Sequence, residues 1–243
     1  MTNLEQPELI PDHIIKKYQG VSTPTLYTLL FKRGYHNTYI QDVQKINTQN
    51  VKMVGQAFTL RYIPAREDID TIAAFKDPKH PQRLAVESVP KGMVLVSDCR
   101  RDATAASAGC ILLSRLEYRG CAGFVSDAGI RDTDVAQEMD FPVFCVNASA
   151  PTNLNKHHGV DLQVPIGCGG APVYPGDLII GDCDGVLVVP LFLALDESVV
   201  DEALEMERFE SYVLDKVRNG SQVIGLYPPN DEARAEYLAA IKS

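Results

Sequence analysis

The sequence predicts an α/β fold built on a parallel β-sheet, and two patterns support this prediction. Between residues 92 and 147, three short apolar runs alternate with two segments typical of helices, as in right-handed βαβ units. After Pro151 the chain is rich in strand formers and in turn sequences such as GG, PGD and CDG, so we expect β-hairpins added to the same core. A length of 243 residues allows one large domain with appended helices.

Two helices should precede the sheet. The segment PDHIIKKYQ is amphipathic, and STPTLYTLLFKRG opens with the capping residues Ser22 and Thr23 and stops at Gly34. The alternating run over residues 54–63 is rich in β formers and predicts the first strand. We expect residues 65–76 and 81–89 to be helical.

The middle of the chain predicts strands over residues 92–98, 121–127 and 141–147, separated by helices over residues 103–120 and 131–139. Towards the C-terminus, residues 191–220 predict a long helix and residues 230–243 a final one. The linker GLYPPN between these two helices would let the last one reach a neighbouring subunit.

Composition argues against several classes of function. A formal net charge of -9 and a pI of about 5.0 disfavour direct nucleic-acid binding or an anionic membrane surface, which would need basic residues in excess. No signal sequence is visible, and no apolar run approaches the roughly 20 residues that span a bilayer. The six cysteines form no C-x-x-C pair, so we expect a reduced, cytoplasmic protein without zinc-ribbon chemistry.

Both central strands end in Val-Ser-Asp, at residues 96–98 and 125–127. Ligands of open parallel sheets bind outside the carboxyl ends of the strands. Asp98 and Asp127 would lie at that edge, with Arg101 and Arg131 close behind. The alternative is that both aspartates only cap the turns that follow them.

The stretch VSDAGIRDTD places Arg131 beside Asp132 at the expected start of a helix. One explanation is a surface ion pair at a helix cap. The other is a site for a small anion and a divalent metal. A guanidinium binds a carboxylate bidentately, and Mg²⁺ prefers oxygen ligands and keeps several waters.

The segment GCILLSRLEYRGCAGFVSDAGIRDTD resembles the regulator of ribonuclease activity A family, in which a glycine-led helix, Arg-Gly, a strand and Gly-x-Arg-Asp follow one another. MVGQAFTLRYIPAREDID, FPVFCVNASAP, VPIGCGGAPVYPGDLIIGDCDGVLVVP and GLYPP also resemble its longer members. The resemblance extends over approximately residues 20–228. The family includes class II 4-hydroxy-4-methyl-2-oxoglutarate/4-carboxy-4-hydroxy-2-oxoadipate aldolases, and also proteins that inhibit a ribonuclease.

The resemblance implies a layered α/β sandwich with a mixed β-sheet core, related to the swivelling phosphohistidine domain. We expect one domain over residues 1–228, with the helices of residues 7–34 packed on it, and a C-terminal helical extension over residues 229–243. It also implies trimers or hexamers with active sites at subunit boundaries.

The resemblance further implies roles for individual residues. In the aldolases, the arginine matching Arg131 holds the carboxylate of a pyruvate-like substrate, and the aspartate matching Asp132 helps to hold Mg²⁺ or Mn²⁺, largely through waters. A metal bound across the keto and carboxylate oxygens of a 2-oxo acid would polarise the carbonyl and stabilise the enolate formed on cleavage. Backbone amides at the helix start also face the substrate there, and the matching residues are Gly109, Cys110, Ile111 and Leu112.

Cys110 departs from the family pattern, because the aldolases usually carry a proton-relaying Asp or Glu at this position. A thiol is a poor ligand for Mg²⁺, and its ordinary pKa is about 8.5, against about 4 for a carboxyl group. Three alternatives stay open. The helix N-terminus could lower the thiol pKa, so that Cys110 acts as a base or nucleophile. Asp98, Arg101 and Asp102 could supply another relay, or Cys110 could only pack, with loss of this function.

Three pairs of residues are weaker candidates. His157 and His158 are adjacent and should point to opposite faces of a strand, so they rarely bind one ion, although His158 could close over an anionic substrate. The resemblance suggests that Arg66 and Glu67 lie in the pocket. It also suggests that a glutamate, Glu207 or Glu210, is contributed to the site of a neighbouring subunit.

We therefore expect a divalent-metal-dependent lyase that converts a small 2-oxo acid to pyruvate by retro-aldol cleavage or decarboxylation, through a metal-stabilised enolate. Its catalytic candidates are Arg131, Asp132, Cys110 and Asp98. The alternative is a catalytically impaired, protein-binding regulator, because Cys110 replaces the usual acid and an acidic surface suits a protein partner better than RNA. A third possibility is another reaction that also proceeds through a metal-stabilised enolate, such as dehydration of a sugar acid.

Overall fold

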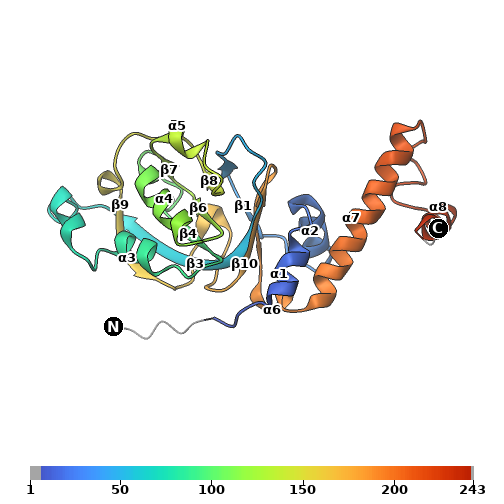
Figure 1. Cartoon of the computed structure of the whole chain (residues 1–243), viewed down its shortest axis with the longest axis horizontal. Coiled ribbons are helices and arrows are strands. Elements are labelled where there is room, and N and C mark those ends of the chain that lie inside the picture. Colours follow the sequence, from blue (N-terminus) through green and yellow to red (C-terminus); the bar gives the residue numbers. More distant parts are fainter. Residues whose placement is uncertain (1–6, 242–243) are drawn as a thin grey trace.

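A mixed nine-stranded sheet forms the centre of the computed structural model, which describes residues 7–241 (Figure 1). Four neighbouring strands of this sheet run parallel, as the βαβ pattern predicts, whereas an antiparallel hairpin extends it on one side. In spatial order the strands are β1 (Tyr39–Ile40), β11 (Gly185–Val189), β10 (Leu178–Asp182), β3 (Met53–Pro64), β4 (Met93–Asp98), β6 (Gly123–Ser126), β8 (Val143–Cys145) and β2 (Gln44–Lys45), with β9 (His157–Leu162) paired to β3.

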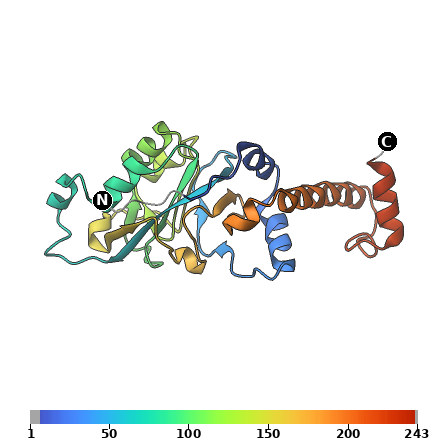
Figure 2. The ribbon, with the colours of Figure 1, turned by 90° about the horizontal axis from the view of Figure 1, so that it is seen from below.

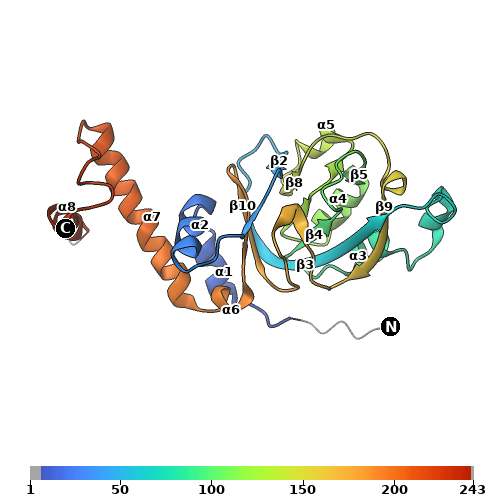
Figure 3. The ribbon, with the colours of Figure 1, turned by 180° about the vertical axis from the view of Figure 1, so that it is seen from behind.

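Helices cover the sheet in two groups (Figures 1 and 3). The group beside the parallel strands is α3 (Pro81–Ser88), α4 (Cys110–Tyr118) and α5 (Thr133–Ala136). The group beside the β10–β11 hairpin is α1 (Asp12–Tyr18), α2 (Thr23–Lys32), α6 (Leu191–Ala194) and α7 (Glu197–Arg218). The predicted layered α/β architecture with extra terminal helices is confirmed.

The central strands are apolar on both faces because both faces are buried. Along β4, Leu95 joins the hydrophobic cluster under α3 and α4, while its neighbours Val94 and Val96 join a second cluster on the opposite face. Along β10, Ile180 likewise faces α1, α2 and α7, and Ile179 faces the second cluster. This arrangement explains why these strands appear in the sequence as continuous apolar runs.

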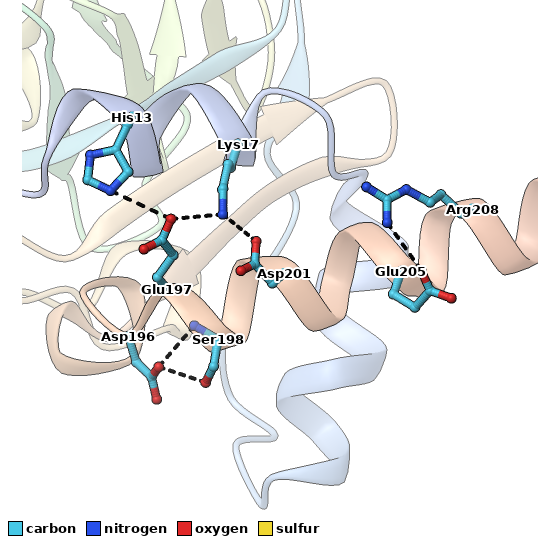
Figure 4. Close-up of polar contacts among 8 residues, drawn as sticks. All are labelled: His13, Lys17, Asp196, Glu197, Ser198, Asp201, Glu205 and Arg208. Atoms are coloured by element: carbon cyan, nitrogen blue, oxygen red, sulfur yellow. Dashed lines mark hydrogen bonds and ion pairs between the residues drawn. The ribbon is translucent and has the colours of Figure 1, made fainter. Parts of the chain in front are cut away.

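The N-terminal helix α1 packs against the start of α7 (Figure 4). Ile14 and Tyr18 of α1 are buried in the same cluster as Val199 and Ala203 of α7. Around this contact, Lys17 Nζ lies 2.8 Å from Glu197 Oε1 and 2.5 Å from Asp201 Oδ1. Exposed ion pairs add little stability, so apolar burial contributes most to holding these two helices together.

Helix α7 continues away from the body of the molecule, and α8 (Asp231–Ala240) crosses its far end (Figures 1 and 2). Val213, Leu226 and Ala233 form a small separate cluster there. The Tyr237 hydroxyl of α8 donates to Glu205 Oε1 of α7 at 2.7 Å. A final helix is thus present as predicted, although residues 242–243 of the predicted range lie outside the described residues.

Four local predictions need correction. Residues 103–108 are not helical: β5 (Ala106–Ala108) pairs in parallel with β7 (Gly129–Ile130), so helix α4 starts only at Cys110. The helix predicted over residues 131–139 shrinks to α5. Residues 65–76 form turns and a 3₁₀ helix, η1 (Ile72–Lys76), and residues 191–220 split into α6 and α7, because the Asp196 side chain caps the second helix.

No helix among the described residues has both the length and the apolar character needed to cross a bilayer.

Candidate active site

A cavity of about 100 Å³ opens between α3, the start of α4 and the junction of β7 with α5. Its volume suits the reacting end of a small organic acid. The polar and charged side chains on its wall come from four parts of the chain and are Gln82, Arg83, Ser107, Arg131, Asp132, Thr152 and Asn153.

Backbone pairing brings Arg131 and Asp132 to this cavity. The Arg131 N–H group donates to the Ala108 carbonyl at 3.0 Å and so extends the β5–β7 pairing. Asp132 then adopts a left-handed backbone conformation, with φ of 59°, at the start of α5. Its carboxylate thereby reaches the first turn of α4, where Oδ2 accepts a hydrogen bond from the Cys110 N–H group at 3.1 Å.

Gly109 leaves room for this arrangement. A Cβ atom at position 109 would lie 2.6 Å from Asp132 Oδ2 and 3.0 Å from Arg131 Cγ. Carbon and oxygen atoms do not approach to 2.6 Å without a shift of one of them. The glycine that precedes α4 is therefore needed by the geometry of the site, and the sequence pattern of a glycine at the helix start has a steric reason.

Arg131 and Asp132 do not neutralise each other in a tight ion pair. The Arg131 Nε and Asp132 Oδ2 atoms are 3.8 Å apart, and the two side chains are 48% and 41% exposed. Both side chains line the cavity. The structure thus brings together the two residues that the sequence singled out, with the charge of each available to a ligand.

Cys110 lies at the edge of this group and is not one of the residues that line the cavity. Desolvation, followed by the adjacent Asp132 carboxylate, raises the pKa of its thiol. This direction is opposite to the one that a Cys110 thiolate at the helix N-terminus needs. Its neighbours Gly109, Ile111 and Leu112 do line the cavity, as expected, although the Leu112 N–H group already donates to the Gly109 carbonyl.

The aspartates at the strand ends have a structural role. Asp98 accepts hydrogen bonds from the N–H groups of Arg100 at 2.9 Å and Gly167 at 3.2 Å. Asp127 is buried, and its carboxylate accepts hydrogen bonds from the N–H groups of Cys99, Arg101 and Gly169. Neither residue lines the cavity, so the capping interpretation describes this edge of the sheet.

The other residues considered for an alternative proton relay, Arg101 and Asp102, are likewise bound to partners elsewhere. The Arg101 guanidinium pairs with Asp42 on the surface. The Asp102 carboxylate accepts hydrogen bonds from the hydroxyl and the N–H group of Thr104, which lower its pKa. Neither residue lines the cavity, and Asp98 does not line it either.

The two histidines point to opposite faces of β9, as predicted. His157 is buried beside Tyr62, whereas His158 Nδ1 lies 2.7 Å from the buried carboxylate of Asp70. That contact anchors the segment over residues 65–80, and Phe75 of this segment reaches the cavity wall.

The remaining candidates lie elsewhere. Arg66 pairs with Asp68 on the exposed 65–80 segment. Glu207 accepts a hydrogen bond from the Ser22 N–H group at 2.6 Å, and Glu210 accepts one from the Thr25 hydroxyl at 3.0 Å. Both glutamates are therefore bound to the start of α2 within their own chain. Glu67 is exposed, and it does not line the cavity.

Sequence reasoning missed eight of the thirteen residues of the cavity wall, among them Arg83, Gln82 and Asn153. The Arg83 guanidinium carbon lies 4.4 Å from the centre of the Phe75 ring. Gln82 is held by a hydrogen bond from Nε2 to the Ser107 carbonyl at 2.6 Å. Asn153 is 4% exposed, and its Nδ2 atom has no hydrogen-bond partner among the described residues. The Gln82 Oε1 acceptor on the same wall also has no partner among the described residues, and buried polar atoms of either kind are costly when unpaired.

The residues present fit a metal bound by one carboxylate and waters. The described residues contain no group of three or more His, Cys, Asp or Glu side chains that could hold an ion, and Asp132 is the one acidic residue on the cavity wall. Mg²⁺ commonly takes one or two carboxylates and keeps several waters, whereas structural zinc needs four protein ligands. The site therefore suits a hard, hydrated cation.

Comparison with known proteins establishes the family. Residues 23–188 match the family model described as RraA-like, Aldolase/RraA. The chain belongs to the RraA-like family. A putative 4-hydroxy-4-methyl-2-oxoglutarate aldolase of Halalkalibacterium halodurans is 36% identical over 155 residues, which cover 64% of this chain and 67% of that protein. Protein DlpA of Legionella pneumophila is 27% identical over 190 residues, but the chain spans only 28% of its length.

Solved structures support the RraA-like fold. RraAS2 of Streptomyces coelicolor, described as an unusual member of the RNase ES inhibitor RraA protein family, has a TM-score of 0.72 and 28% identity, and the match covers 85% of this chain and 98% of that one. An uncharacterized protein from Pseudomonas syringae has a TM-score of 0.75 at 24% identity, with 89% and 98% covered. The resemblance seen in the sequence is thus confirmed for family and fold.

Proposed function

We propose that this RraA-like protein is a divalent-metal-dependent lyase that releases pyruvate from a small 2-oxo acid. The observation that carries the proposal is the convergence of Arg131 and Asp132 on one cavity, with a glycine-led helix start beside them and no tight ion pair between them. The relatives that bear the name of putative 4-hydroxy-4-methyl-2-oxoglutarate aldolase support a carbon–carbon lyase.

Each charged group has a definable task in this proposal. The Arg131 guanidinium binds the carboxylate of the 2-oxo acid through two parallel hydrogen bonds. The Asp132 carboxylate, already oriented by the Cys110 N–H group, would hold Mg²⁺ or Mn²⁺ together with waters. When bound, the cation would polarise the 2-oxo group and stabilise the negative charge that develops on its oxygen.

The two lyase reactions differ in their need for a base. In retro-aldol cleavage, the 4-hydroxyl group loses a proton, the C3–C4 bond breaks with its electrons moving towards the 2-oxo group, and C3 then takes up a proton. In decarboxylation of a 2-oxo acid with a carboxylate on C3, the C3–C4 bond breaks as CO₂ leaves, and only the protonation of C3 follows. Cleavage in the second reaction therefore needs no group that removes a proton.

The cavity is poor in such groups. The Cys110 thiol lies beside the wall and its pKa is raised, and Asp132 is the one carboxylate on the wall. General acid–base catalysis contributes about 10²- to 10⁴-fold, so its loss should slow retro-aldol cleavage much more than decarboxylation. Within the lyase class, the site therefore favours decarboxylation.

The test is pyruvate release, with added Mg²⁺ or Mn²⁺, from oxaloacetate and from a panel of 4-hydroxy-2-oxo acids. Cys110→Asp should raise the retro-aldol rate at least about tenfold while changing oxaloacetate decarboxylation less than about threefold. Cys110→Ser is the matched control, because a hydroxyl restores no base. Absence of turnover across the whole panel by folded protein, wild type and Cys110→Asp alike, would refute the lyase.

A second function is a protein-binding regulator on the same scaffold. Two observations favour it: Cys110 stands where a proton relay is expected, and the similar RraAS2 is described as a member of an RNase inhibitor family. If Cys110→Asp gains no activity and the wild-type protein retains a stable protein partner through gel filtration, the regulator is the better description.

A further inference from the structure

We infer that a second cavity, between the end of α2, the turn before β10 and helix α6, binds a small organic cation with a substituted ammonium group. This cavity has a volume of about 640 Å³, which is in the range of ordinary small-molecule sites. It shares no lining residue with the cavity at Arg131 and Asp132, so the inference does not depend on the lyase proposal.

Three aromatic side chains line this second cavity. Tyr35 follows α2, Tyr174 lies before β10, and Phe192 belongs to α6. The ring centres of Tyr35 and Phe192 are 6.1 Å apart, with an angle of 57° between the ring planes. Tyr174 and Phe192 are 57% and 62% exposed, so much of their surface can contact a ligand. The faces of such rings carry partial negative charge and attract a cation.

Hydrogen bonds of the main chain hold these walls in place. The Asp177 carboxylate joins two of them, because Oδ2 accepts from the Tyr174 N–H group at 2.8 Å and Oδ1 from the Leu191 N–H group at 2.9 Å. On the third wall, the Tyr35 N–H group donates to the Leu30 carbonyl at 3.0 Å. The cavity is thus formed before a ligand binds, which lowers the cost of binding.

The charge of the lining favours a cation over an anion. Glu8 and Asp177 line the second cavity, whereas none of its described lining residues is a lysine or an arginine. Neither carboxylate forms an ion pair with another described residue. Asp177 is buried, and this burial raises its pKa more than its two N–H partners lower it. A cationic ligand would supply the counter-ion that the buried carboxylate lacks.

The lining also offers a hydrogen bond to a ligand. Thr38 is 6% exposed, and its Oγ1 atom has no hydrogen-bond partner among the described residues. An unpaired buried hydroxyl group is costly, and a polar group of the ligand would pair with it. A substituted ammonium compound that carries a hydroxyl group therefore matches both the charge and the hydrogen-bonding capacity of the lining.

The test compares choline with 3,3-dimethylbutan-1-ol, in which a carbon atom replaces the charged nitrogen while the shape is kept. Titrations followed by nuclear magnetic resonance should show that the wild type binds choline at least about fivefold more tightly. The reason is that the aromatic rings and the two carboxylates attract only the charged ligand. Equal affinities, a preference for the alcohol, or no detectable binding of choline would overturn the inference.

Three variants assign the binding to this cavity. Phe192→Leu keeps an apolar side chain without the ring, so choline should bind about threefold or more weakly and the alcohol within about twofold of the wild type. Glu8→Gln should act in the same direction. Thr38→Val should weaken both ligands alike, because both carry the hydroxyl group. If Phe192→Leu weakened both ligands equally, or neither, the inference would fail.

A matched control removes an aromatic ring from another surface. Tyr118 is 83% exposed on α4 and does not line the second cavity, so Tyr118→Leu should alter neither affinity. Oxalate with Mg²⁺, which would occupy the cavity at Arg131, should leave choline binding unchanged. Competition between oxalate and choline would show that choline binds elsewhere and would overturn the inference. A protein that prefers choline but turns over no 2-oxo acid would refute the lyase proposal alone.

Discussion

At the scale of single residues, Gly109 controls the candidate site by having no side chain. In Gly109→Ala, the added methyl group would collide with the Asp132 carboxylate and the Arg131 side chain. We expect a loss of about 1–3 kcal/mol in unfolding free energy from overpacking, and a loss of ligand binding at the displaced pair. Urea denaturation and calorimetry with 2-oxoglutarate measure the two effects.

Gly167→Ala is the matched control for that change. A Cβ atom at position 167 meets nothing within 4 Å, and the backbone there has a negative φ of -119°. Its stability and ligand affinity should stay close to those of the wild type. If Gly109→Ala behaved like Gly167→Ala, the close approach between the start of α4 and Asp132 would be unimportant for the site.

His157 should make the stability of the fold sensitive to acid. It is buried, its Nε2 atom has no hydrogen-bond partner among the described residues, and burial lowers its pKa. In the unfolded chain this histidine takes up a proton near pH 6.5, whereas in the folded chain it does so only at lower pH. The free energy of unfolding therefore falls as the pH decreases below about 6.5.

Urea denaturation at about pH 7 and about pH 5 should therefore show a smaller pH-dependent loss in His157→Gln than in the wild type, by up to about 1.4 kcal/mol for each unit by which the pKa is lowered. The pH dependence is the readout, because the substitution itself also changes packing. Identical losses in the two proteins would show that His157 does not titrate differently in the folded state.

At the scale of elements, the segment over residues 65–80 forms part of the cavity wall, although it is mostly exposed. The Asp70 carboxylate anchors it to β9 through His158, and within the segment it accepts a hydrogen bond from the Arg66 N–H group at 2.7 Å. Asp70→Ala should raise the KM or Kd for the ligand about three- to tenfold with little change in overall stability, because Phe75 and the stacked Arg83 lose their support.

Hydrogen exchange over residues 65–80 should become faster in this variant while the central strands stay protected. Asp68→Ala is the control, because Asp68 pairs with Arg66 on the surface and touches neither His158 nor the cavity. Unchanged exchange in Asp70→Ala would mean that the segment is held by other contacts.

The elements that the sequence predicted well are those whose signal is local. β3, β4 and β6 are continuous β-rich or apolar runs bounded by turn residues, and α2 has a Ser22 cap and a proline in its first turn. β5 was missed because its residues, Ala106 to Ala108, are small and lie in an alanine-rich run that favours a helix. Its strand conformation depends on pairing with β7, about twenty residues later, which no local pattern encodes.

The residues of the candidate site likewise fall into two groups, those with a local signal in the sequence and those without one. Arg131 and Asp132 could be found because they are adjacent in the sequence and follow a buried strand. Arg83 and Asn153 could not, because they come from α3 and from the segment before β9, and only the packing of these elements brings them to one cavity. Asp98 has the same local signal as a catalytic acid, but its oxygens are used by backbone N–H groups across the sheet edge.

At the scale of the whole molecule, the far end of α7 with α8 forms an arm that stands away from the body (Figure 2). Several apolar side chains on this arm are exposed, among them Ile224 at 91%, Val223 at 52% and Ile241 at 52%. Self-association as a trimer or hexamer remains a prediction, and the exposed apolar side chains of this arm would be favourably buried against a neighbour.

Light scattering after gel filtration should therefore give a mass of three or six chains for the wild type, and a smaller mass for Ile224→Glu, because a carboxylate cannot be buried cheaply in an apolar contact. Asn219→Asp adds the same charge on the same arm at an exposed polar position and should leave the mass unchanged. A monomeric wild type, or an Ile224→Glu protein that assembles normally, would contradict this prediction.

The left-handed backbone conformation at Asp132 also affects how a protein of this fold can change its function. Asparagine and glycine adopt this conformation as readily as aspartate does, so a one-codon replacement there would discard the anionic ligand for the cation and leave the frame intact. A single substitution at position 132 could therefore remove or restore the carboxylate that the proposed metal site needs. Related proteins could change between lyase and non-enzymatic roles in this way without any change in the sheet.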